Sequence, residues 1–169
     1  MKDARLRYII ATLEPPAGKG LWYGGVSIIG SLKGVKVEQA LWKPATERHS
    51  IWELMLHIAY WKYAVRNKLV DGNPGGFDRS PVNWPVIPSG ASNKDWEMDK
   101  QLLKNEHKLL VEAVKNFDGR LMDEMVPRSS KWTYADILMG TVTHDIYHTG
   151  QIMLMKRLYK EANMGVINY

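Results

Sequence analysis

The chain of 169 residues contains no cysteine. This absence excludes disulfide bonds, thiolate metal ligands and cysteine nucleophiles. A metal ion bound by this chain must therefore be held by nitrogen or oxygen atoms. Nitrogen ligands are available from five histidines, which are His49, His57, His107, His144 and His148.

The sequence also lacks long apolar runs and clusters of basic residues. Its longest apolar stretches are far shorter than a membrane span, and the N-terminal segment shows no secretory signal. The net charge is +5, but lysine and arginine are scattered among acidic residues, and no nucleic-acid-binding motif is visible. We therefore expect a cytoplasmic protein that has neither a membrane nor a nucleic acid as its partner.

Helical patterns dominate what is present, and no clear run of strands appears. The length is sufficient for one domain with a real core, so we expect a single domain over residues 1–169. The first helix is expected over residues 3–14, where two prolines stop it. Shorter helical pieces are expected near residues 25–33 and 36–41.

The second helix has a well-marked start. Ser50 and Glu53 form the pattern of a capping box, in which each side chain satisfies a backbone donor of the other residue. His57 lies on the apolar side of this helix, towards one edge. Helical spacing predicts one buried face made of Ile51, Leu54, Ile58, Trp61, Val65 and Leu69.

A long loop separates the second helix from the third. Residues 71–91 contain four glycines and four prolines, and a loop of this length in a compact domain often lies over a site. Its apolar residues, including Val86, are expected to pack. Arg79 and Trp84 are candidate pocket residues.

Two further helices complete the pattern. The third is expected from Ser92 to about Phe117, and its buried stripe is Trp96, Leu103, Leu110 and Val114. The fourth begins at Thr133, and glycines at 140 and 150 are expected to permit close helix contact. These connections predict an all-α, four-helix bundle with the Pro/Gly-rich loop between the second and third helices.

His144 and His148 are four residues apart on the core-facing side of the fourth helix. This spacing brings both side chains to one face, where two unpaired imidazoles would be costly to bury. A divalent metal ion removes that cost, and His57 is the natural third ligand. Three nitrogen ligands with an open position are typical of a catalytic metal site.

Several neighbouring residues allow more than one interpretation. A lone inward histidine is more often a hydrogen-bonded core residue than a ligand, and for His107 we favour packing over a role as fourth ligand. Asp145 stands where zinc proteases of the H-E-x-x-H type carry glutamate, but it is better interpreted as a salt-bridging carboxylate or one that supports a ligand. Gln151 either orients a ligand or packs between helices.

Two segments resemble the DinB-like (damage-inducible) superfamily, which includes bacillithiol-transferase-like proteins. They are SIWELMLHIAYW at residues 50–61 and HDIYHTGQI at residues 144–152. The resemblance extends from the first helix to about Leu158. It implies a four-helix bundle, a three-histidine metal site between helices and a homodimer. His57, His144 and His148 match the three ligands one for one.

These observations favour a metal-dependent enzyme, with zinc or nickel as the cofactor. A thiol-dependent S-transferase would join a low-molecular-weight thiol to a small electrophile. The alternatives are a metal-dependent hydrolase and a non-enzymatic metal-binding protein of the stress response.

Overall fold

The computed structural model describes residues 3–16, 20–21, 24–70 and 75–164, and within these residues it contains helices and no strand. The elements are α1 (Ala4–Leu13), α2 (Ile28–Ser31), α3 (Val37–Leu41), α4 (Ile51–Leu69), α5 (Asn93–Asn116), a 3₁₀ turn η1 (Gly119–Leu121) and α6 (Tyr134–Met164). The prediction of an all-α protein is confirmed, and the predicted helix bounds agree closely with these.

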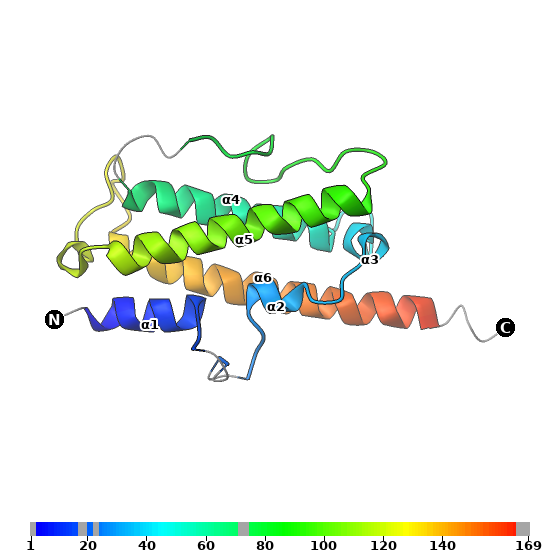
Figure 1. The fold of residues 1–169 in the computed structure, drawn as a ribbon, viewed down its shortest axis with the longest axis horizontal. Helices are drawn as coiled ribbons and strands as arrows, with labels where there is room; N and C mark the ends of the chain where they lie inside the picture. The colour runs from blue at the N-terminus through cyan, green and yellow to red at the C-terminus, as the bar shows by residue number, and fades with distance from the viewer. Residues whose placement is uncertain (1–2, 17–19, 22–23, 71–74, 165–169) are drawn as a thin grey trace.

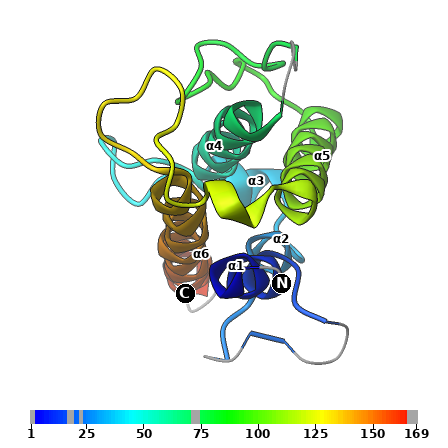
Figure 2. The same ribbon diagram turned by 90° about the vertical axis from the view of Figure 1, so that its left-hand side faces the viewer.

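Three long helices form the body of the molecule. Figure 1 shows α4, α5 and α6 along the long axis, while α1 and α2 follow one another beside α6. Viewed from the end, α1 and α2 close the side of the assembly opposite α4 (Figure 2). Residues 75–91 run back along the outer side of α4 and α5 (Figure 1), and Asn83 and Trp84 of this loop contact His57 of α4.

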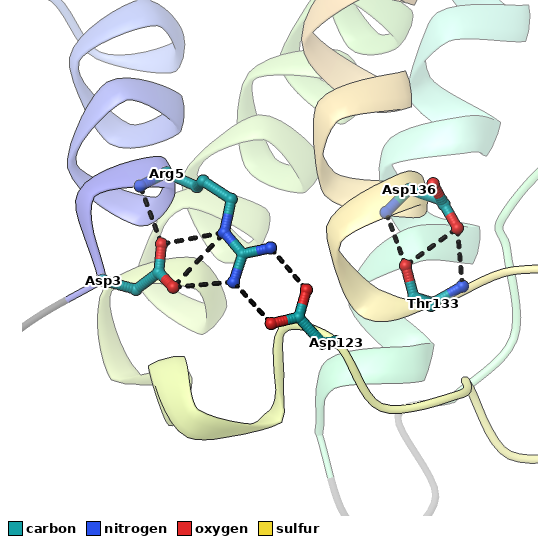
Figure 3. A network of polar contacts seen from close by, with 5 residues as sticks. All are labelled: Asp3, Arg5, Asp123, Thr133 and Asp136. Atoms are coloured by element: carbon teal, nitrogen blue, oxygen red, sulfur yellow. Dashed lines mark hydrogen bonds and ion pairs between the residues drawn. The ribbon is translucent and has the colours of Figure 1, made fainter.

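Each long helix begins with a reciprocal cap. Ser50 and Glu53 form the predicted capping box of α4, and Ser92 with Asp95 forms a second one at α5. At α6, Asp136 Oδ2 accepts hydrogen bonds from the backbone N–H and the hydroxyl of Thr133, and Thr133 Oγ1 accepts one from the Asp136 N–H (Figure 3). The caps satisfy N–H groups that a helix start otherwise leaves without partners.

The core contains two apolar clusters. The larger joins α2, α3, α4, α5 and α6 around Trp52 and Trp96, whose rings meet edge to face at 5.1 Å. The smaller lies where α1 meets α5 and α6. The predicted stripe of α5 is confirmed, because all four of its members are fully buried.

Three packing predictions are wrong. Trp61 is 42% exposed, whereas the neighbouring Lys62 is only 1% exposed, because a salt bridge to α6 draws Lys62 inward. Val86 is 65% exposed at the outer surface of the loop. Gly140 and Gly150 do not mediate close contact, since a Cβ placed at either would meet nothing within 4 Å.

The N-terminal helix is tied to the segment before α6 by charge. Arg5 donates hydrogen bonds to Asp3 and to Asp123, so one guanidinium joins the cap of α1 to residues more than a hundred positions away (Figure 3). The hydrogen bond from Arg5 lowers the pKa of Asp3 to about 2 and also lowers the pKa of Asp123.

In the described part of the chain, no helix is both long enough and apolar enough to cross a membrane.

The Arg5 cluster predicts a specific acid sensitivity. Carboxylates with lowered folded-state pKa values stabilise the fold above their unfolded pKa, near 4, and this contribution is lost as the pH falls towards 2. We expect the urea midpoint of Arg5→Gln to vary less between pH 4 and pH 2.5 than that of the wild type. Arg7→Gln, at an exposed position of the same helix, is the control. Identical pH dependence in all three proteins would contradict the assignment.

Candidate metal centre

Three imidazoles meet between α4 and α6. His144 and His148 lie one turn apart on α6, and His57 faces them from α4. His144 Nε2 lies 3.2 Å from His57 Nε2 and 3.1 Å from His148 Nε2. One ligand nitrogen from each histidine falls within 4.8 Å of the other two. The structure thus brings together the three residues proposed from the sequence.

The outer nitrogens of two of these rings have fixed partners. His57 Nδ1 lies 2.7 Å from the backbone oxygen of Asn83, and His148 Nδ1 lies 2.6 Å from Oε1 of Gln151. Because these oxygens can only accept, each Nδ1 carries the proton, and each Nε2 presents a lone pair to the centre. Partners of this kind orient the ligands of metal sites.

The protons available do not satisfy all of these nitrogens. A neutral His144 carries one ring proton. Even if this proton is on Nε2, it can be donated to only one of the two neighbouring Nε2 atoms. In the other contact, the lone pairs of two nitrogens face each other. Adding a second proton is disfavoured: burial, followed by the nearby His148 and His57, lowers the pKa of His144 to about 3. Burial also lowers the pKa values of His57 and His148.

The geometry fits a divalent cation. With metal–nitrogen bonds of about 2.0–2.1 Å, two imidazole nitrogens on one ion lie about 2.8–3.4 Å apart. The distances of 3.2 Å and 3.1 Å fall in this range. His144 is thus spaced from both His57 and His148 as two ligands of one ion are, and the three residues could hold one ion between them.

Aromatic rings cover the His57 side of the centre. The Trp84 ring stacks on His57 with centroids 3.9 Å apart, and His49 stacks on Trp84 at 3.7 Å. Trp61 donates its indole N–H to Asn83 Oδ1 at 2.9 Å. Trp84 therefore lies against a candidate ligand. The stacking of His49 on Trp84 could not be predicted from the sequence, because it depends on how residues 75–91 lie against α4.

The remaining candidates lie outside the group of three. Asp145 Oδ2 pairs with Lys62 Nζ at 2.5 Å, as a salt-bridging carboxylate would. The Arg79 guanidinium binds the buried carboxylate of Asp99 at 2.6 Å. His107 faces a small cavity of about 20 Å³ together with Asp145, and it is not among the clustered ligands.

A larger pocket opens beside the centre. It lies between α4 and α6, has a volume of about 390 Å³ and is bordered by His144. Its walls are mainly apolar, formed by Ile58, Trp61, Val65, Trp132 and Ile137. Small-molecule sites typically combine such walls with a few polar groups.

The fold and site define an all-helical protein with a histidine cluster between two of its long helices. A family model described as the DinB superfamily matches residues 28–152, which include all three histidines. Because this match covers most of the chain, the protein belongs to the DinB superfamily. No curated protein and no solved structure matches the chain with significance.

The buried ion pair beside the cluster gives a stability prediction. Lys62→Met removes one partner and leaves the Asp145 carboxylate uncompensated, which should cost about 3–5 kcal/mol in the free energy of unfolding. The double variant Lys62→Met/Asp145→Leu should recover most of this loss, because it removes both charges. Urea denaturation measures both effects, and a single variant as stable as the wild type would contradict the prediction.

Proposed function

We propose that His57, His144 and His148 bind one zinc or nickel ion and that the protein is a thiol-dependent S-transferase acting on small electrophiles. The observation that carries the proposal is the convergence of three Nε2 atoms, two of which belong to rings whose Nδ1 protons are held by Asn83 and Gln151. Three nitrogen ligands leave at least one position open for a reactant.

A divalent ion, when bound, supplies a Lewis acid that lowers the pKa of a thiol at its open position. The protein's own groups then perform three tasks. Asn83 and Gln151 hold the ligand rings in orientation, Trp84 covers the His57 ring, and the pocket beside His144 receives the second reactant.

The transfer balances without any redox partner. The thiol loses its proton to solvent, and its sulfur forms a bond to an electrophilic carbon. The bond between that carbon and its leaving group breaks, and the leaving group departs with the electron pair. Attack by water instead of the thiol would require a general base to remove a proton from the water molecule.

Hydrolysis is supported less well by the surroundings of the centre. In the described residues, no carboxylate forms a hydrogen bond with the three histidines. The nearest acidic residue in sequence, Asp145, is paired with Lys62, and Glu53 serves the cap of α4. A general base for water is therefore not apparent among these groups.

Metal binding can be measured directly. We expect the wild type to hold about one zinc or nickel ion per chain, and a ligand at about 100 times its Kd should stabilise the fold by about 2.7 kcal/mol. His144→Ala should lose both the ion and the gain in Tm. His107→Ala, which alters a histidine outside the cluster, should keep both.

Gln151→Ala should weaken metal binding by about 10–100-fold, since it removes the partner of His148.

Wild-type protein without stoichiometric metal after exposure to either ion would overturn the proposal. Metal content by elemental analysis and Tm by calorimetry are the two measurements, and chelation should reverse the gain in Tm.

The transferase reaction can be tested with 1-chloro-2,4-dinitrobenzene and a panel of low-molecular-weight thiols. We expect metal-dependent formation of the thioether, followed by absorbance, and a loss of about 100-fold or more in His57→Ala, since a ligand should matter at least as much as its supporting partners. Activity that persists in His57→Ala would rule out this mechanism. Formation of dinitrophenol without any thiol would point to hydrolysis instead.

A further inference from the structure

The pocket between α4 and α6 has features that restrict what it can bind. It reaches His144 at one end, and its volume of about 390 Å³ lies near the lower end of the range for small-molecule sites, about 300–1,000 Å³. A molecule bound in this pocket would therefore contact His144, the half-buried histidine of the candidate metal centre.

The residues that line the pocket offer no free positive charge. Lys62 and Asp145 form an ion pair with each other, and the Asp136 carboxylate accepts hydrogen bonds from Thr133 (Figure 3). An anionic occupant would have to give up its hydration without gaining a free counter-charge. The pocket therefore favours a neutral molecule over an anion.

Two tryptophans shape the walls. The Trp61 ring is fixed by its hydrogen bond to Asn83 Oδ1, yet 42% of Trp61 remains exposed. Trp132, which is 49% exposed, precedes α6 and also lines the pocket. Flat indole surfaces of this kind stack well on other aromatic rings.

Gly140 keeps the space between these walls open. It belongs to α6 and lines the pocket, and a Cβ at this position would meet nothing within 4 Å. A larger side chain there would enter the pocket without displacing neighbouring atoms.

We propose that this pocket is the electrophile subsite of the transferase and that it takes a small, neutral aromatic compound. The ring packs against Trp61 and Trp132, and its reactive carbon faces His144. The assignment of an electrophile rests on the proposed function, whereas the binding of a neutral aromatic molecule does not.

The test uses 1,3-dinitrobenzene, which lacks the leaving group of chlorodinitrobenzene and so binds without turnover. Calorimetric titration of the protein as purified should detect binding, and 3,5-dinitrobenzoate, which adds a negative charge to the same ring, should bind more weakly. Gly140→Leu should weaken dinitrobenzene binding by about tenfold or more, because its side chain occupies the site. Gly150→Leu places the same side chain on the same helix outside the pocket, and it should bind dinitrobenzene like the wild type.

Metal content should be equal in both glycine variants, which separates the pocket from the metal centre. The inference is overturned if dinitrobenzene does not bind, if Gly140→Leu binds it as well as Gly150→Leu does, or if the carboxylate binds more tightly. If dinitrobenzene binding follows this pattern but no thiol is transferred to chlorodinitrobenzene, the aromatic site stands and the transferase proposal fails.

Discussion

The hydrogen bond between His57 and the backbone of Asn83 determines how the covering loop and the histidine cluster fit together. Asn83 has a φ of +66°, a left-handed conformation that asparagine adopts more readily than most residues. In this conformation its backbone oxygen meets His57 and its side-chain oxygen meets Trp61. Trp84, the next residue, then lies flat on the His57 ring. One turn of the loop thus sets the tautomer of a candidate metal ligand and the position of two tryptophans.

The helices of this protein were predictable because their signals are local. Capping residues at Ser50, Ser92 and Thr133 mark three helix starts, and apolar spacing identifies the buried stripe of α5. The spacing of His144 and His148 likewise places both on the inner side of α6. A cap or an i, i+4 pair involves residues within one turn, so the sequence contains all the partners.

Contacts between distant segments were not predictable in the same way. Two charged residues of α4 are buried because each has a partner on another helix: Lys62 pairs with Asp145 on α6, and Arg66 pairs with Glu106 on α5. The spacing of apolar residues in the sequence does not reveal such pairs. The consequence is the exposure of Trp61. His57 lies near the edge of the predicted face, yet it is only 7% exposed, since the returning loop covers it.

The relation between His148 and Gln151 has a consequence for how the centre is assembled. Both residues belong to α6, as does His144, so a single helix supplies two donor nitrogens and the group that orients one of them. Two histidines four residues apart lie on one face of a helix, so their spacing is a property of α6 alone. His57, by contrast, comes from α4, and its ring contacts residues 83 and 84 of the loop. If an ion binds as proposed, two of its three ligands would depend on one helix alone, whereas the third would depend on the packing of α4 against α6 and on the contacts of residues 83 and 84.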